Sequence, residues 1–120
     1  MKCLLLWLLI ALTPSLPTAQ PIACNLAALN HAERDRLTAL LDKLTTGAMH
    51  RQELPDGYAY EIRPEKLSFR EVAEWVSLES RCCPFLNFRI DLAGGAVRLQ
   101  LTGGSGVKQF IQSEMHRLPK

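Results

Sequence analysis

The sequence has no hydrophobic run long enough to cross a membrane as a helix. Its longest apolar stretch, residues 3–12, covers 10 residues, whereas a spanning helix needs about 20. Lys2 precedes this stretch, and prolines and small residues follow it, which is typical of a secretory signal peptide. We therefore expect residues 1–19 to be a leader cleaved after Ala19, and residues 20–120 to be a single domain. The mature protein is expected to be periplasmic or secreted, without stable membrane insertion.

One alternative for the N-terminus stays open. Ile22-Ala23-Cys24 resembles the end of a bacterial lipoprotein signal, although Pro21 stands where a leucine is usual. In that interpretation the leader is cleaved before Cys24, whose sulfur then carries a lipid. Of the two cleavage sites, the one after Ala19 is preferred.

The sequence also lacks a cluster of charge of one sign. Its formal net charge is only +2, and Lys and Arg alternate with Asp and Glu along the chain. A nucleic-acid surface requires a basic face that neutralises phosphates, so we expect no nucleic-acid partner. The chain has no Ser-His-Asp order, paired-carboxylate motif or dinucleotide-binding loop. No catalytic residue is predicted, an enzyme is disfavoured, and no protein partner is identified.

Apolar periodicity and turn residues predict one helix and two hairpins. Leucines at helical spacing indicate a first helix over residues 29–46, ended by Gly47 in a left-handed cap. Residues 50–64 alternate in polarity around a Pro-Asp-Gly turn and predict a first hairpin. Strands over residues 87–92 and 96–102, joined by a Gly-Gly turn, predict a second.

Two further helices are marked by their first residues. Ser68 and Glu71 form a capping box that begins a second helix, and Pro84 ends it near Cys82. Its predicted apolar face consists of Phe69, Val72, Ala73 and Val76. A closing helix follows Ser105, its expected N-cap. Its predicted apolar face consists of Val107, Phe110, Ile111 and Met115. The order of elements predicts an α+β fold, with an antiparallel four-stranded sheet of two hairpins and about three helices packed on one face.

Cysteine is scarce, and no C-x-x-C motif is present. Of the 4 cysteines, Cys3 is expected to leave with the leader, so that Cys24 and the vicinal pair Cys82-Cys83 remain. Structural zinc normally takes four nitrogen or sulfur ligands from short paired motifs, and is therefore disfavoured. Soft ions such as Cu(I) and Hg(II), and trivalent arsenic, accept two or three thiolates. Because the second helix should end between the neighbouring cysteines, both sulfurs can face one point.

Glu79 is a candidate oxygen ligand beside these sulfurs. It precedes Cys82 by three residues and Cys83 by four, on the same side of the helix, where it could also accept a thiol proton. The alternative is an ordinary surface carboxylate paired with Arg81 or another neighbour. The histidines show no ligand spacing and are expected to lie on the surface: His31, His50 and His116.

Three motifs occur in a recognisable order. They are I-A-C-x-L at residues 22–26, E-x-x-C-C-x-F-L-x-F at residues 79–88, and L-x-L-T-G at residues 99–103. This order resembles a family of small, mostly uncharacterised bacterial proteins, in which no activity is firmly attached to the motifs. The paired cysteines are similar to those of mercury-resistance and other soft-metal-handling proteins. The resemblance implies that the three cysteines after the leader are thiol positions.

Two functions follow from these residues. The first is binding of a soft metal or metalloid ion, Cu(I), Hg(II) or arsenite, through Cys24, Cys82, Cys83 and Glu79. The second is a non-catalytic binding or interaction module, in which Cys24 forms a disulfide with Cys82 or Cys83 in an oxidising compartment. Such a bond closes a loop of about 58 residues and stabilises the fold by about 4 kcal/mol. Thiol redox catalysis is disfavoured, because the dipole at a helix C-terminus does not favour a thiolate.

Overall fold

The computed structural model describes Pro14 and residues 22–115 of the chain. Apart from Pro14, the predicted leader over residues 1–19 lies outside the described residues, as do its cleavage site after Ala19 and the histidine at position 116. Within the described part of the chain, every helix is too short or too polar to span a membrane.

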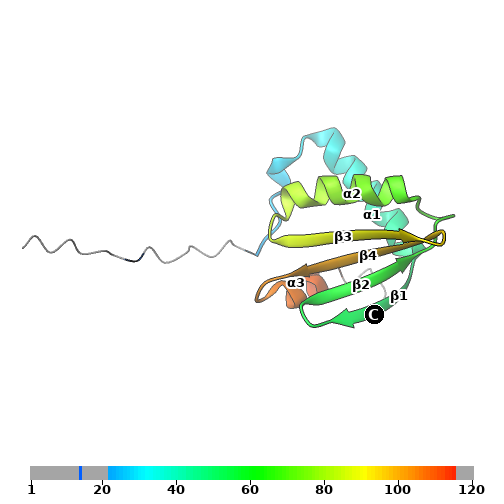
Figure 1. The fold of residues 1–120 in the computed structure, drawn as a ribbon. Coiled ribbons are helices and arrows are strands. Elements are labelled where there is room, and N and C mark those ends of the chain that lie inside the picture. The colour runs from blue at the N-terminus through cyan, green and yellow to red at the C-terminus, as the bar shows by residue number, and fades with distance from the viewer. Residues whose placement is uncertain (1–13, 15–21, 116–120) are drawn as a thin grey trace, which may run out of the picture.

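The described residues form three α-helices, a short 3-10 helix and a four-stranded antiparallel sheet (Figure 1). In chain order they are η1 (Leu26–Ala28), α1 (His31–Gly47), β1 (Ala48–Leu54), β2 (Gly57–Ile62), α2 (Phe69–Cys82), β3 (Leu86–Ala93), β4 (Ala96–Gly103) and α3 (Val107–Glu114). The strands lie in the order β1-β2-β4-β3, so each hairpin forms one half of the sheet. The predicted α+β class and both hairpins are confirmed.

One face of the sheet carries the core. On the central strands the register pairs Tyr58 with Leu101, Tyr60 with Leu99, and Ile62 with Val97, and all six residues are at most 2% exposed. Each helix adds buried side chains to the same cluster: Leu40 and Leu44 from α1, Val72 and Trp75 from α2, and Val107 and Ile111 from α3. The opposite face carries mostly polar residues, among them Gln52, Glu61 and Gln100. The three helices therefore cover one face of the sheet, as predicted.

The first helix ends differently from the prediction. Gly47 is its last residue and does not have a positive φ, and the cap is Ala48 in an extended conformation. The strand β1 begins at Ala48, so the chain passes directly from helix to strand without a left-handed turn. The glycine instead permits close packing, because a Cβ at Gly47 would lie 3.2 Å from the Cβ of Lys66.

The buried face of α2 also differs from the prediction. Phe69 is 41% exposed, and the buried residues are Val72, Trp75, Glu79 and Cys82. The buried stripe thus includes a carboxylate and a thiol, which an assignment based on apolar residues alone does not select. This stripe brings Glu79 and Cys82 to the interior.

The third helix is preceded by Gly106 as its N-cap rather than by Ser105. Gly106 is the N-cap with a left-handed φ of 88°, and no side chain caps the helix. The predicted apolar face is confirmed, because Val107, Ile111 and Met115 are buried and Phe110 packs against the core. A left-handed turn that glycine adopts without strain sets the direction of α3.

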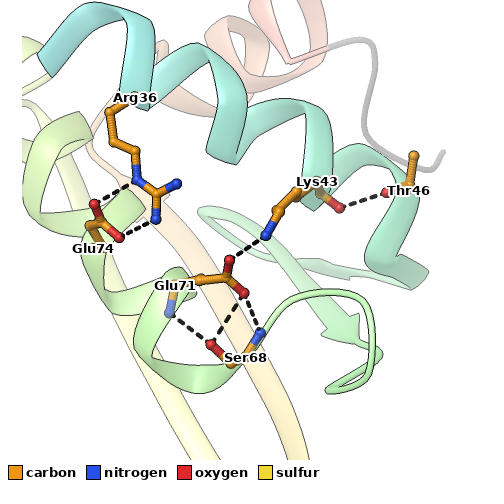
Figure 2. Close-up of polar contacts among 6 residues, drawn as sticks. All are labelled: Arg36, Lys43, Thr46, Ser68, Glu71 and Glu74. Carbon is orange, nitrogen blue, oxygen red and sulfur yellow. Dashed lines mark hydrogen bonds and ion pairs between the residues drawn. The ribbon is translucent and has the colours of Figure 1, made fainter. Parts of the chain in front are cut away.

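Ion pairs hold α1 beside α2 (Figure 2). Arg36 donates two hydrogen bonds to the carboxylate of Glu74, both 2.7 Å long, and Lys43 pairs with Glu71. Glu71 also completes the capping box with Ser68, and the hydrogen bond from Lys43, followed by that from Ser68, lowers the pKa of Glu71 to about 2. Pairs of this kind near the surface each contribute little stability. They link α1 to the first half of α2.

Candidate functional site

The candidate site lies where α2 ends. Cys83 leaves the helix with φ −121° and ψ 67°, and its backbone N–H donates the last helical bond to the carbonyl of Glu79 at 2.8 Å. Pro84 disfavours helical geometry at Cys83, which explains the break at this position. Cys82 and Cys83 are 1% and 0% exposed. The predicted end of the helix between the two cysteines is confirmed.

The segment of residues 22–29, here called the N-terminal strap, crosses this helix end. The backbone N–H of Asn25 donates to the carbonyl of Cys82 at 2.7 Å, and Arg81 donates to the carbonyl of Ala28 at 2.9 Å. At the start of the strap, Ile22 lies so close to Gly106 that an added Cβ there would stand 2.7 Å from its Cδ1. These contacts place Cys24 next to the vicinal pair.

Cys24 forms a disulfide with Cys83, with a Cα–Cα distance of 4.7 Å and a sequence separation of 59 residues. This distance lies in the normal range for a disulfide. Cys82 remains a free, buried thiol. The expected proximity of Cys24 to the vicinal cysteines is confirmed, and the pairing that the sequence left open is with Cys83.

Glu79 is buried between the sulfurs. It is 8% exposed, its Oε1 lies 3.3 Å from Sγ of Cys83, and its Oε2 lies 3.9 Å from Sγ of Cys82. A disulfide sulfur has no hydrogen, so only the protonated carboxyl can donate in the contact with Cys83. Arg81 pairs with Glu33 at 2.6 Å. The alternative of a solvated Glu79 paired with Arg81 is therefore wrong.

Burial shifts the pKa values of both titratable groups in the site. It raises the pKa of Glu79 to about 7, against the opposing effect of a hydrogen bond from Cys82. It also raises the pKa of Cys82 to about 11, with the charge of Glu79 as the next cause. Each shift has the direction expected when a charged form loses its hydration. At neutral pH the Cys82 sulfur is therefore held as a thiol.

The donor atoms of four side chains gather in one place. One atom each from Cys24, Glu79, Cys82 and Cys83 lies within 4.8 Å of the others. With metal–sulfur bonds of about 2.3 Å, as for zinc, ligands on opposite sides of an ion stand about 4.6 Å apart. The four atoms thus occupy a volume close to that of one coordination sphere. The histidines at positions 31 and 50 are exposed and outside this group.

A pocket of about 480 Å³ adjoins the four donors. Its lining includes Cys24, Glu79 and Cys82, and its apolar walls are formed mainly by Leu37, Leu41, Trp75, Phe110 and Met115. These walls come from α1, α2 and the C-terminal end of the described chain. Sequence reasoning missed the pocket, because no local pattern shows that segments so distant in sequence will meet. The indole Nε1 of Trp75 is buried and has no hydrogen-bond partner among the described residues.

A second cavity, of about 380 Å³, lies on the sheet away from the sulfurs. Glu61, Asp91 and Arg98 are among its lining residues. Arg98 donates to the side chain of Gln52 at 2.7 Å. Its charges are of both signs and its described lining contains no cysteine. Among the described residues, the cysteines lie together at the end of α2.

No protein-family model matches this chain, and neither a curated protein nor a solved structure matches it. The resemblance based on the order of three motifs therefore stays a prediction. Function has to be argued from the geometry of the site.

Proposed function

We propose that the protein binds one soft metal or metalloid ion, of the class of arsenite, Hg(II) or Cu(I), when the Cys24–Cys83 disulfide is reduced. In this state Cys24, Cys82 and Cys83 supply the thiolates, and Glu79 is a nearby oxygen donor. The observation that carries the proposal is the gathering of these four donor atoms within 4.8 Å.

The chemistry of the donor set favours a soft ion. Three sulfurs and one carboxylate, with no described histidine among them, match the preference of thiophilic ions better than that of structural zinc. Cys82, Cys83 and Glu79 are buried, so few water molecules compete for the ion. Hg(II) and Cu(I) displace the thiol protons on binding, so the affinity for these two ions should rise with pH. Glu79 is placed to accept one of these protons.

The disulfide itself favours a second candidate function. In a non-catalytic interaction module, the Cys24–Cys83 bond would only fasten the N-terminal strap to the domain. The bond is compatible with an oxidising compartment and so supports the proposed export to the periplasm or medium. In that case the reduced protein has three thiols after the leader but no preference for a soft ion.

Titration of the reduced full chain with sodium arsenite separates the two functions. The protein is reduced with a phosphine, the phosphine is removed, and bound arsenic and free thiols are measured by intact mass and a thiol reagent. We expect one arsenic per chain and the loss of the free thiols after the leader. Hg(II) and Cu(I) are titrated in parallel.

Single substitutions test whether the sulfurs act together. Cys24→Ser, Cys82→Ser and Cys83→Ser should each weaken arsenite binding by at least about tenfold, because each removes one of three thiolates. Ser80→Ala, on the exposed side of α2, is the control and should bind as the unmodified chain does. Titratable thiols at all three cysteines after the leader, without uptake of arsenite, Hg(II) or Cu(I), would contradict the proposal and favour the interaction module.

A further inference from the structure

The pocket beside the sulfurs is much larger than a single ion requires. Its volume of about 480 Å³ falls in the range of sites that hold small organic molecules, about 300–1,000 Å³. Inorganic arsenite or a bare cation would occupy only the corner where the donors meet. The rest of the space calls for a ligand with an organic part.

The three cysteines of the cluster differ in whether they line the pocket. Cys24 and Cys82 are among the lining residues, whereas Cys83 is not and is 0% exposed. A ligand held in the pocket would therefore meet two thiols rather than three. Trivalent arsenic with one organic substituent has two exchangeable positions, which matches this number.

The walls of the pocket suit an apolar organic group on the arsenic. Leu37 and Leu41 of α1, Phe110 of α3 and the aromatic Trp75 of α2 surround the space next to the sulfurs. The described lining contains no lysine or arginine, and its titratable carboxyls are those of Glu79 and Glu114. Such a lining disfavours an anion and accepts a neutral molecule.

We propose that the preferred substrates are trivalent arsenicals with one aryl or alkyl group, held by the sulfurs of Cys24 and Cys82 with the organic group in the pocket. This inference rests on the proposed function and names its substrate class. It assigns to α1 and α3 the recognition of the organic group, and it leaves Cys83 free when such a ligand is bound.

The binding reaction balances without a change of oxidation state at arsenic. A dithiol or phosphine first reduces the Cys24–Cys83 disulfide and is itself oxidised, to a disulfide or a phosphine oxide. The arsenical, R–As(OH)₂, then forms one bond to each sulfur of Cys24 and Cys82. Both As–O bonds break, and each thiol proton leaves with a hydroxyl group as water. The As–C bond stays intact.

Phenylarsine oxide and sodium arsenite serve as paired probes on the phosphine-reduced full chain. Thr38 lines the pocket and is exposed on α1, so Thr38→Trp should fill part of the space without disturbing the core. The Thr38→Trp variant should weaken phenylarsenical binding by about tenfold or more, because the phenyl ring of the ligand can no longer be buried. The same variant should change arsenite binding by less than about twofold. Ala39→Trp, next to it but outside the lining, should change neither. Dissociation constants are measured by competition with a dithiol.

Cys83→Ser provides an independent measurement. It should weaken arsenite binding, which uses three thiolates, and leave phenylarsenical binding within about threefold of the unmodified chain. The inference would be overturned if Thr38→Trp weakened the binding of both probes equally, or if Cys83→Ser lost the binding of both. In either case, arsenite binding by the unmodified chain would still uphold the proposed function. Failure of arsenite, Hg(II) and Cu(I) alike would overturn the proposed function itself.

Discussion

Glu79 illustrates how a single side chain links stability to chemistry in this protein. Its carboxyl lies between two sulfurs in the interior, and burial raises its pKa to about 7. The fold therefore tolerates the neutral acid better than the carboxylate. The unfolded chain, where the pKa is near 4.5, loses this proton at a lower pH than the folded chain does.

The consequence is a loss of stability as pH rises. Below about pH 4.5 Glu79 is protonated in both the folded and the unfolded state. Between pH 4.5 and 7 it loses its proton in the unfolded state but keeps it in the folded state, so the unfolded state becomes increasingly favoured as pH rises. Above about pH 7 Glu79 is ionised in both states, and the free energy of unfolding falls no further on its account. We expect the free energy of unfolding of the unmodified chain to fall by roughly 2–3 kcal/mol relative to Glu79→Gln across this interval.

Urea denaturation of both proteins from pH 4 to pH 8.5, with the disulfide intact, measures this difference. Other titrating groups are common to the two proteins and cancel. A difference that stays constant with pH would show that burial does not hold the proton on Glu79.

At the scale of elements, α2 is defined most clearly by its capping box. The side chain of Ser68 accepts from the backbone N–H of Glu71, and Glu71 accepts from the N–H of Ser68. Figure 2 shows the same Glu71 paired with Lys43 of α1. The beginning of α2 and its contact with α1 thus share one carboxylate.

We expect Ser68→Ala to lower the free energy of unfolding by about 1 kcal/mol, because it leaves an N-terminal N–H of α2 without its acceptor. Ser105→Ala is the matched control: this exposed serine precedes α3 but makes no cap there. Its effect should stay within about 0.5 kcal/mol. Chemical denaturation at pH 7 measures both. A larger loss for Ser105→Ala than for Ser68→Ala would contradict the assignment of the caps.

Local signals were sufficient to predict most of the elements. The capping box, the Gly-Gly turn and the alternation within the hairpins each depend on residues close in sequence, and the structure confirms them. The exposure of Phe69, the burial of Glu79 and the pairing of Cys24 with Cys83 depend on contacts between distant segments. The sequence could place three sulfurs as candidates, but the pocket beside them arises only when α1, α2 and α3 pack together.

At the scale of the whole molecule, the disulfide joins the N-terminal strap to the end of α2. It closes a loop that contains α1, the first hairpin and α2. A cross-link over 59 residues restricts the unfolded chain and stabilises the folded one by about 4 kcal/mol in the chain-entropy model.

Reduction should therefore lower the free energy of unfolding by about 4 kcal/mol, with α1 and the sheet retained in the folded state at neutral pH. Denaturation with and without a phosphine reductant, followed by circular dichroism, measures the change. The double variant Cys24→Ser/Cys83→Ser is the control and should be insensitive to the reductant. Equal stability of the oxidised and reduced proteins would mean that the bond restricts the unfolded chain very little.

The irregular start of β1 bears on how this border of the sheet can meet another molecule. β1 is an outer strand of the sheet, and its register with β2 shifts between Ala48 and His50. Such a bulge twists an outer strand and interrupts its row of free backbone groups, which limits edge-to-edge aggregation. A strand from another molecule can follow the regular ladder only along the short stretch from His50 to Leu54. Insertion of one residue at a single position thus shortens the stretch of this border that a neighbouring copy could pair with.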